Sequence, residues 1–533
     1  MIVLKNTRMK RAAYLGSAVA LLSISGTALA ADGLQIIKKN CLSCHTETGN
    51  SDAPFSRISE QRKTPEGWMT TLYRMKTQRG LNISPEEEQV LIKYLSDTQG
   101  LAPSETLAQR YILERTPNKV EEVDPAYAEM CTRCHSGARF GMQRRTQGEW
   151  EKLVHFHMGQ YPTIEYHALA RDRAWFDIAL NDVAPKLAAD YPFKAQAWDD
   201  WAAKPKSDLT GNWMMSGYLP EKGDFSAQLS VIKEADDRYV LLVNGTYADG
   251  SKLNGSGSAK VFTGYEWRAS LIIDGQALKQ VLATDEQGIR MSGRMFVKGS
   301  DEIGGAITAV KAGSSPAIAA VSPTYVKQGS TQTLVITGAN LDQPLSFGEG
   351  LDAKVVSQAS DHIVVQVKAG ADAPVGMRTL SIGSARVEDA IAVFDKLARV
   401  DITPNDSIAR IGGNGGLIPK QKAVYRAIGY AAGADGKPGT EDDLKLGYMP
   451  ASWSLKPFDQ VAEEDHDLKY AGKIDARGIF TPGDAGLNPE RRMSANNVGN
   501  LTVVGTVTEG EQMLSGNAHL MVTVQDYVRS LIQ

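Results

Sequence analysis

Cysteine is scarce in this sequence, with four in 533 residues, and all four fall in two copies of one short motif. No Gly-x-Ser-x-Gly elbow, P-loop or dinucleotide-binding glycine fingerprint occurs, so the motifs of serine hydrolases, P-loop nucleotidases and dinucleotide-dependent enzymes are missing. After residue 30 no run reaches about 18 consecutive apolar residues, so no transmembrane helix is predicted there. The chemistry of the chain must therefore be sought around its few cysteines.

The two motifs have the form Cys-x-x-Cys-His and read Cys41-Leu42-Ser43-Cys44-His45 and Cys131-Thr132-Arg133-Cys134-His135. This spacing is typical of c-type haem attachment, because two thiols three positions apart can add to the two vinyl groups of one porphyrin. The histidine that follows is then placed to bind the iron as its proximal ligand. A zinc site would need further ligands at suitable spacing, and a redox dithiol would not repeatedly be followed by histidine. We therefore predict two covalently bound haem c groups.

The N-terminal 30 residues carry no acidic side chain and read as a secretory signal peptide. Four basic residues, Lys5, Arg8, Lys10 and Arg11, precede an apolar stretch at 12–24 and a cluster of small residues at 26–30. We expect cleavage before Ala31 and a periplasmic location for a haem-bearing exported chain. Removing the leader takes the formal net charge from −4 to −8, and this mildly acidic balance argues against nucleic acid as a partner.

The segments that follow the two haem motifs resemble each other and indicate an internal duplication. Each opens with a threonine suited to cap a helix, Thr64 or Thr146, and places a tryptophan four residues later. Each then continues with apolar or ligand-type residues at helical spacing, which are Trp68, Leu72 and Met75 in the first segment and Trp150, Val154 and His157 in the second.

Met75 and His157 are the predicted sixth ligands of the two irons. Each lies seven residues after its tryptophan and so returns to the same side of the helix, and Met and His are the usual partners of a proximal histidine in cytochromes. Weaker candidates are His155, His167, Met69, Met142 and Met158. His155 would point about 140° away from the tryptophan face, and His167 is the reserve candidate. Met75 could instead be a core methionine, and His157 a packed or hydrogen-bonded side chain.

Beyond residue 205 helical periodicity gives way to short alternating runs separated by glycine-rich turns, which is typical of antiparallel strands. The predicted fold class is multidomain, α plus all-β: a mainly helical dihaem cytochrome c domain, then an antiparallel β-barrel and two immunoglobulin-like β-sandwich domains. The predicted boundaries are 1–30 for the signal peptide, 31–205 for the dihaem domain (two cytochrome-like units, about 31–115 and 116–205), 206–312 for the barrel, 313–395 for an immunoglobulin-like (IPT/TIG-like) domain and 396–533 for a C-terminal immunoglobulin-like domain.

Two further features are weaker signals. Segment 435–443 crowds acidic residues among glycines, so calcium binding stays open, but the positions do not fit an EF-hand loop and a solvated hairpin turn is favoured. His362, His466 and His519 stand singly and are interpreted as structural or surface residues.

The order of these parts resembles the alpha subunit of quinohemoprotein amine dehydrogenase, across essentially the whole mature chain. The resemblance rests on the two Cys-x-x-Cys-His motifs, the helices of Trp68 and Trp150, and the Ile336-Thr337-Gly338 turn of the third domain. It implies a heterotrimer with a beta-propeller subunit and a small gamma subunit that carries cysteine tryptophylquinone, the group that oxidises primary amines. It also implies that electrons pass to the haems of this chain and then to a soluble acceptor, either an azurin-like blue-copper protein or a cytochrome c.

The residues agree with such a division of labour. Irons with both axial positions filled cannot bind substrate, and no cysteine is left over for a quinone cross-link, so we assign no catalytic residue to this chain. Since methionine raises haem potential relative to histidine, we expect the His135/His157 haem to receive electrons and the His45/Met75 haem to deliver them. A dihaem peroxidase, which needs an open sixth site, and a stand-alone dihaem electron carrier are the alternatives.

Overall fold

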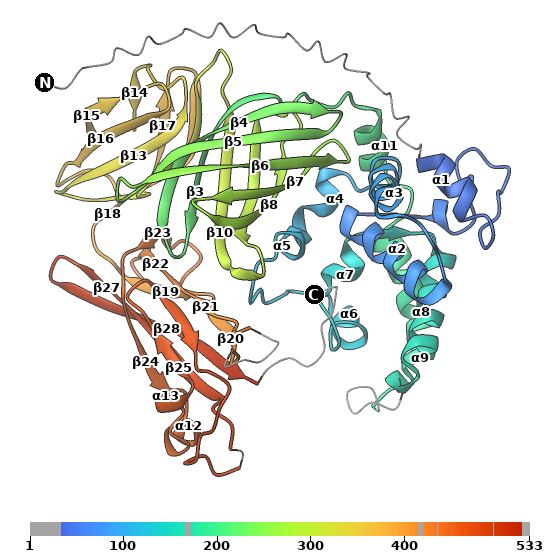
Figure 1. Ribbon diagram of the computed structural model, residues 1–533. Helices are drawn as coiled ribbons and strands as arrows, with labels where there is room; N and C mark the ends of the chain where they lie inside the picture. The colour runs from blue at the N-terminus through green and yellow to red at the C-terminus, as the bar shows by residue number, and fades with distance from the viewer. Residues whose placement is uncertain (1–32, 166–171, 414–418, 434, 494, 525–533) are drawn as a thin grey trace, which may run out of the picture.

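The computed structural model describes residues 33–165, 172–413, 419–433, 435–493 and 495–524 (Figure 1). Its first part is helical, the next is a closed antiparallel β-barrel, and the rest forms further β-sheet domains, which confirms the predicted fold class. The predicted signal peptide at 1–30 and the reserve ligand His167 lie outside the described residues. Within the described ranges no helix is both long enough and apolar enough to cross a membrane.

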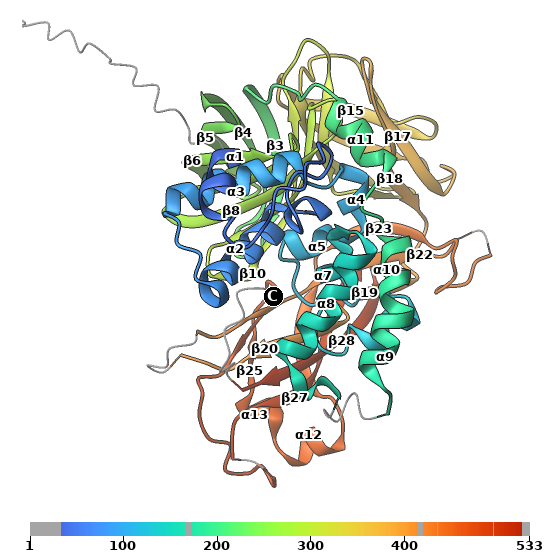
Figure 2. The ribbon, with the colours of Figure 1, turned by 90° about the vertical axis from the view of Figure 1, so that its right-hand side faces the viewer.

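The helical domain consists of short helices whose starts follow their capping residues. Thr64 and Thr146 each accept a hydrogen bond from the backbone N–H three residues on, and Ser84 forms a reciprocal capping box with Glu87. The helices are α1 Gly33–Asn40, α2 Pro65–Arg79, α3 Pro85–Thr98, α4 Pro103–Thr106, α5 Arg110–Leu113, α6 Pro125–Met130, α7 Ala138–Gly141, α8 Gln147–Gln160, α9 Trp175–Ile178, α10 Ala184–Asp190 and α11 Gln196–Ala203. A π-helical turn, η4 Ala179–Val183, joins α9 to α10, and α10 packs beside α8 (Figure 2).

The two halves of this domain meet in a small antiparallel sheet made of β1 Gln61–Lys63 and β2 Gln143–Arg145. The strands read Gln-Arg-Lys and Gln-Arg-Arg, and each leads directly into a threonine-capped helix, α2 or α8. Arg62 pairs with Arg144 at the centre of the register, so equivalent residues of the two units lie opposite each other. The repeat therefore extends further toward the N-terminus than the threonine and tryptophan pattern indicates, and it has approximate twofold symmetry about this pair.

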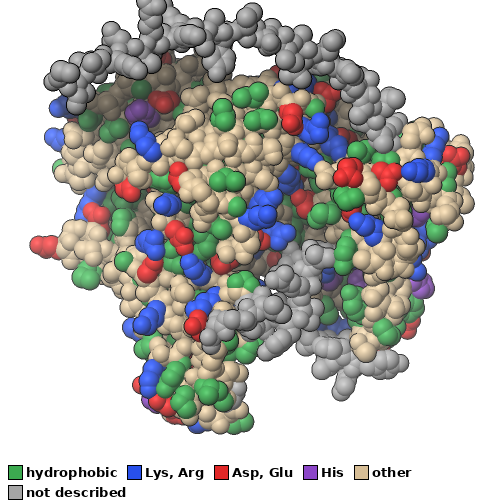
Figure 3. All heavy atoms as spheres, in the orientation of Figure 1, with side chains coloured by type: hydrophobic (Ala, Val, Ile, Leu, Met, Phe, Trp, Pro, Cys, Tyr) green, Lys and Arg blue, Asp and Glu red, His purple; other side chains and the backbone are tan. Residues whose placement is uncertain are grey.

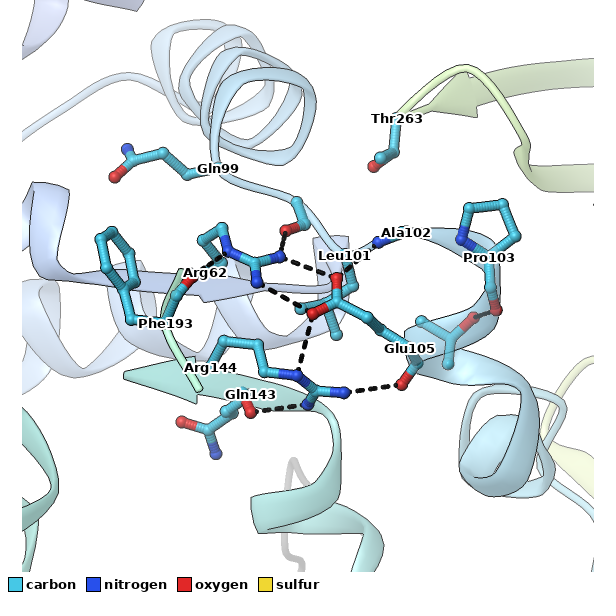
Figure 4. Close-up of polar contacts among 12 residues, drawn as sticks. Arg62, Gln99, Leu101, Ala102, Pro103, Glu105, Gln143, Arg144, Phe193 and Thr263 are labelled. Carbon is cyan, nitrogen blue, oxygen red and sulfur yellow. Dashed lines mark hydrogen bonds and ion pairs between the residues drawn. The ribbon is translucent and has the colours of Figure 1, made fainter. Parts of the chain in front are cut away.

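A single buried carboxylate holds this centre together. The carboxylate of Glu105, which lies in α4, accepts two hydrogen bonds from Arg62, at 2.8 and 2.9 Å, and one from Nε of Arg144 at 3.0 Å (Figure 4). The side chains of all three residues are at most 8% exposed. A buried pair of this kind is costly to break from one side only, because the remaining charge is left without compensation.

The barrel is closed by pairing of its last strand with its first. Its eight strands are β3 Gly211–Leu219, β4 Gly223–Ala235, β5 Arg238–Tyr247, β6 Lys252–Phe262, β7 Glu266–Ile273, β8 Gln276–Thr284, β9 Arg290–Val297 and β10 Ser300–Lys311. Alternate residues along the strands are buried and fill the interior, with Trp213 and Trp267 among the largest. The barrel is therefore a packed core rather than a channel.

The helical domain rests on one end of this barrel through buried polar contacts (Figure 1). Arg110 of α5 forms an ion pair with Glu266 of β7 at 2.6 Å, and Arg268 pairs with Glu66 of α2 at 2.7 Å. Nε1 of Trp201 in α11 donates to the carbonyl of Thr263 at 2.8 Å. These contacts fix the orientation of the haem motifs relative to the barrel.

The third domain consists of two four-stranded sheets that pack on one shared apolar core. The first sheet has the order β11 Ala317–Ser322, β13 Thr331–Ala339, β16 His362–Ala369, β15 Leu351–Gln358, and the second has β12 Tyr325–Lys327, β18 Ala385–Phe394, β17 Gly376–Ile382, β14 Leu345–Ser346. After β13 the chain turns at Asn340, which adopts a left-handed φ of 54° and donates to the carbonyls of Gly313 and Ser315. Asparagine tolerates this conformation better than most residues.

The last domain contains three small sheets and two short helices around a second apolar core. Its strands are β19 Arg399–Thr403, β20 Asp406–Arg410, β21 Ala423–Val424, β22 Arg426–Ala431, β23 Leu444–Met449, β24 Ser452–Pro457, β25 Gly472–Ile474, β26 Ile479–Pro482, β27 Gly499–Glu509 and β28 Gln512–Thr523, and its helices are α12 Gln460–Glu464 and α13 Asp467–Tyr470. The immunoglobulin-like assignment of the third and fourth domains stays a prediction.

Candidate haem-binding sites

The second Cys-x-x-Cys-His motif follows α6 and forms a tight helical turn. Cys131 is half-buried and Cys134 is exposed, and none of the four cysteines forms a disulfide. Burial, with a smaller contribution from Cys134, raises the pKa of the Cys131 thiol to about 12. A redox dithiol requires a lowered thiol pKa, so this environment is unlike that of a disulfide-exchange site.

His135 and His157 converge on one cavity from different elements. His135 follows α6, whereas His157 lies near the end of α8, and their ring centroids are 6.4 Å apart with the ring planes inclined by 41°. Nδ1 of His135 donates to the carbonyl of Ser136 at 2.9 Å, and Nδ1 of His157 donates to the carbonyl of Leu153 at 2.7 Å. Both rings therefore have Nε2 left as the available ligand atom.

The spacing of these rings suits a metal ion between them. Metal–imidazole bonds of about 2.0–2.1 Å, with each ring centroid roughly 1.1 Å behind its nitrogen, require centroids about 6.3 Å apart. Burial lowers the pKa of both imidazoles, and the positive charges of neighbouring arginines act in the same direction. Neutral imidazole is the form that binds metal. The donor set of two thiols, a proximal histidine and an opposing histidine thus fits a c-type haem.

The cavity has a volume of about 450 Å³ and lies between the motif, α8 and the η4 segment. Both cysteines of the motif and both histidines line it, together with Trp150. Its remaining wall combines several arginines with apolar side chains, which include Leu153, Val154, Trp175, Ala179 and Val183. Two of these residues belong to the π-helical turn, a feature that often occurs at functional sites.

The weaker ligand candidates lie elsewhere. The ring of His155 packs edge-on against Phe176, with centroids 5.2 Å apart, and does not line the His135 cavity. Met142 is buried in a separate cluster against the barrel, and Met69 is 46% exposed. Met158 is partly buried at the edge of the second unit's core.

In the first unit the motif follows α1, and Nδ1 of His45 donates to the carbonyl of Ser56 at 2.9 Å. Cys41 packs at the edge of a core that includes Trp68 and Leu72 of α2. Met75 lies in the last part of α2, seven residues after Trp68, and is half-buried. The structure thus brings His135 and His157 together, and it places the helix that bears Met75 against the core that contains Cys41.

Sequence reasoning missed the basic residues around these sites. Lys63 and Arg145 occupy equivalent positions and each lies over the tryptophan of its own unit, with charge-to-centroid distances of 5.0 Å for Trp68 and 5.5 Å for Trp150. Burial lowers the pKa of Lys63 well below its usual value, and Arg145 adds to this shift. The repeated Gln-Arg-Lys-Thr and Gln-Arg-Arg-Thr stretches are the signal that could have identified them.

A second, larger cavity of about 830 Å³ lies between α2 and barrel strands β6 to β9. Eight Lys or Arg side chains line it against two acidic ones, and Figure 3 shows Lys and Arg side chains over the barrel strands toward the helical domain. Arg74, Arg139 and Gln143 line both this cavity and the one that contains His135.

The acidic segment at 435–443 forms a turn between β22 and β23. Its carboxylates are used locally: Asp435 accepts from the backbone of Lys437 at 2.8 Å, and Asp443 accepts from Gly439 at 2.8 Å and from Arg399 at 3.1 Å. No cluster of three or more metal-ligating side chains occurs within the described part of the chain.

A helical domain with two Cys-x-x-Cys-His motifs, mounted on a β-barrel and followed by β-sheet domains, defines a multidomain haem-binding protein. Family models of the quinohemoprotein amine dehydrogenase alpha subunit match four consecutive stretches: the haem-binding domain at 31–198, domain II at 206–312, domain III at 315–395 and domain IV at 400–532. The chain belongs to this family. It is accordingly a haem-binding subunit of an amine dehydrogenase, an oxidoreductase.

Comparison with individual proteins adds little to this assignment. No curated protein matches the chain. Among solved structures, the redesigned β-barrel mFAP1 bound to DFHBI is 15% identical, with 19% of this chain and 94% of that chain covered and a TM-score of 0.18. Domains 5–6 of the S-layer protein SbsC are 16% identical, with 40% and 100% covered and a TM-score of 0.17. Both TM-scores are too low to indicate a shared overall fold.

Proposed function

We propose that this chain is the electron-transfer subunit of a periplasmic quinohemoprotein amine dehydrogenase and carries two covalent c-type haems. The observation that carries the proposal is the pair of imidazoles in the second unit. His135 and His157 line one cavity with Cys131 and Cys134, their ring centroids are 6.4 Å apart, and both Nδ1 atoms donate to backbone carbonyls. Hydrogen bonds of this kind fix the tautomer and the orientation of a metal-binding histidine.

The proposed attachment sites are Cys41 and Cys44 for the first haem and Cys131 and Cys134 for the second, with His45 and His135 as proximal ligands. Met75 and His157 are the proposed sixth ligands. A bound haem supplies reversible one-electron transfer. With haem bound, these side chains would supply two ligands to each iron and would leave no open site for amine or peroxide, and this supports electron transfer over peroxidase chemistry.

The amine-oxidising group is proposed to lie on another polypeptide. All four cysteines are assigned to haem attachment, so none remains to form cysteine tryptophylquinone in this chain. Family membership supports a heterotrimer with a beta-propeller subunit and a small quinone-bearing gamma subunit, and a soluble azurin-like protein or cytochrome c as acceptor. The basic leader at 1–30, which precedes the matched haem-binding domain, supports export to the periplasm.

The two ligand pairs suggest an order of transfer. Because a methionine ligand raises the potential relative to a second histidine, we place electron entry at the unit of His135 and exit at the unit of His45 and Met75. Potentiometric titration that assigns the lower potential to the unit of His45 would contradict this order.

Mass spectrometry of the mature chain and quinone staining after denaturing electrophoresis test the proposal together. We expect a mass that accounts for two covalent haems and the absence of residues 1–30, and quinone staining on a separate small subunit that co-purifies. Fewer than two haems on the chain would overturn the electron-transfer assignment. Purification as a lone dihaem polypeptide without a quinone subunit would favour a stand-alone carrier instead.

A further inference from the structure

Two arginines in the cavity of His135 and His157 differ from the other basic residues there. Among the described residues five arginines line this cavity, and three have carboxylate neighbours: Arg133 and Arg173 lie near Asp172, and Arg145 lies 3.7 Å from Glu149. Arg74 and Arg139 are half-buried, and neither has a carboxylate within ion-pair distance among the described residues. Two uncompensated guanidinium groups in a partly buried site are unfavourable unless an anion joins them.

The two side chains bring like charges into one confined space. Both line the cavity that contains His135 and His157, and both are half-buried. Two positive charges held there repel each other and favour an anion near the predicted iron site.

A buried hydrogen-bond donor in the same cavity lacks an acceptor. Trp150 is 1% exposed and lines the cavity, and its Nε1 has no hydrogen-bond partner among the described residues. The equivalent Trp68 donates from Nε1 to the carbonyl of Gln99 at 3.1 Å. Burying an indole N–H without an acceptor is costly, so the second unit lacks a partner that the first unit has.

We propose that Arg74, Arg139 and Nε1 of Trp150 form the propionate-binding site of the haem held by His135 and His157. This inference rests on the proposed haem ligation and deepens it. A c-type porphyrin keeps two carboxylates after its vinyl groups have reacted, which provides the two negative charges and the acceptor oxygens that these residues lack. Guanidinium groups bind carboxylates through two parallel hydrogen bonds, so each arginine suits one propionate.

The site crosses the boundary between the two units. Arg74 belongs to α2 of the first unit and directly precedes Met75, but it lines the cavity of the second unit. Its guanidinium carbon lies 5.2 Å from the ring centroid of Phe156, which directly precedes His157. One helix thus carries the predicted iron ligand of one haem and a proposed propionate partner of the other.

The test combines potentiometry with resonance Raman spectroscopy on the full chain that carries both haems. In Arg74→Gln and Arg139→Gln the loss of a nearby positive charge favours the ferric form of the second haem. At the midpoint potential of the wild-type second haem, we expect the ratio of reduced to oxidised haem to fall roughly tenfold in each variant. This corresponds to a decrease of about 59 mV in the midpoint potential of a one-electron couple. The propionate bending modes should shift in the same variants and in Trp150→Phe. Arg74→Lys keeps the positive charge, so the potential of the second haem should stay close to the wild-type value. Because lysine cannot form two parallel hydrogen bonds, the propionate modes should still shift, but less than in Arg74→Gln.

Arg57→Gln is the matched control. Arg57 occupies the position equivalent to Arg139 but pairs with Glu149 at 3.0 Å and does not line this cavity. We expect a change in the ratio of less than twofold and unchanged propionate modes. Unshifted propionate modes in Arg74→Gln and Arg139→Gln, or a shift confined to the haem of His45, would overturn the assignment. The haem count by mass stays at two in either case, so failure here is distinguishable from failure of the proposed function.

Discussion

Three histidines of the helical domain share one local arrangement. In His45, His135 and His157 the Nδ1 atom donates to a backbone carbonyl at 2.7–2.9 Å, which leaves Nε2 as the free lone pair. His155 lacks this arrangement and instead packs on Phe176. The hydrogen bond from Nδ1 to a backbone carbonyl is therefore present in the three predicted ligands and absent in His155. It depends on each histidine and the backbone close to it.

His157→Ala tests the sixth ligand of the second haem. We expect this haem to change from a low-spin to a high-spin visible and EPR spectrum, because the iron loses its second strong-field nitrogen ligand. The first haem should keep its spectrum. His155→Ala is the matched control on the same helix and should leave both haems low-spin. A low-spin second haem in His157→Ala would show that another residue is the ligand.

Glu105→Gln tests the buried charge at the centre of the helical domain. Removing the carboxylate leaves Arg62 and Arg144 facing each other without compensation, so we expect the free energy of unfolding to fall by about 3–5 kcal/mol. Chemical denaturation of the haem-loaded protein measures this. Glu47→Gln, which removes an exposed partner 3.9 Å from Lys38, should cost less than about 1 kcal/mol.

The same carboxylate predicts a pH dependence. Burial alone would raise the pKa of Glu105, but hydrogen bonds and charge from Arg62 and Arg144 outweigh burial and lower it. Its stabilising contribution is therefore complete above the unfolded-state pKa of about 4.3 and is lost as the pH falls through the lower folded-state value. We expect the free energy of unfolding of the wild-type protein to fall more steeply below pH 4 than that of Glu105→Gln. Parallel curves for the two proteins would contradict the assignment.

At the scale of helices and strands, several helices of the helical domain begin at a single polar residue whose side chain caps the first turn. The Ser84 side chain accepts from the N–H of Glu87 at 3.1 Å, and the Glu87 side chain accepts from the N–H of Ser84 at 3.0 Å. This capping box begins α3, which packs Leu91 and Leu95 into the core beside Cys41. A local hydrogen-bond pattern at one helix end therefore supports the wall of the first haem unit.

Ser84→Ala tests this cap. We expect a loss of about 1 kcal/mol in the free energy of unfolding, because at least one N–H at the helix start loses its acceptor. Thermal unfolding followed at the haem absorption and by far-ultraviolet circular dichroism measures it. Ser84→Asp replaces the hydroxyl by a carboxylate that can also cap the helix, so this variant should remain close to the wild-type stability. Equal losses in the two variants would show that the cap does not contribute.

At the largest scale, the barrel supports the haem domain through buried ion pairs that cross between the two domains. Glu266 is 2% exposed at its side chain and accepts from both Arg110 of the helical domain and Arg268 of its own strand. Tyr265 next to it hydrogen-bonds the carbonyl of Leu101 at 3.1 Å. The barrel end is therefore complementary to the helical domain in charge and in hydrogen bonding.

Glu266→Gln tests this docking. Because Arg110 and Arg268 lose a shared buried carboxylate, and Arg110 keeps, among the described residues, only its contact with Glu114 at 3.2 Å, we expect a loss of about 3–5 kcal/mol and a separation of haem-domain unfolding from barrel unfolding in differential scanning calorimetry. Glu286→Gln removes an exposed partner of Lys204 at the same junction and should change stability by less than about 1 kcal/mol. A single cooperative transition in Glu266→Gln would show that the docking does not depend on this ion pair.

Features that depend on neighbours along the chain could be predicted from the amino-acid sequence. The Cys-x-x-Cys-His spacing, the caps at Thr64, Ser84 and Thr146, and the alternating barrel strands could all be read because local geometry sets them. The fold class and the family followed from their order. The spacing of His157 from Trp150 also predicted its side of α8, since seven residues nearly complete two helical turns.

Contacts between residues far apart in the sequence became visible in the folded chain alone. The pairing of Arg62 with Arg144 around Glu105, the place of Arg74 in the cavity of the other unit and the Arg110–Glu266 junction each join segments far apart in the sequence. The spacing of residues along the sequence does not predict such contacts, because a buried charge is stabilised by whichever partner the folded chain brings near it. The same holds for Trp150: within the part of the chain that the structure describes its Nε1 has no hydrogen-bond partner, whereas Nε1 of the equivalent Trp68 donates to Gln99.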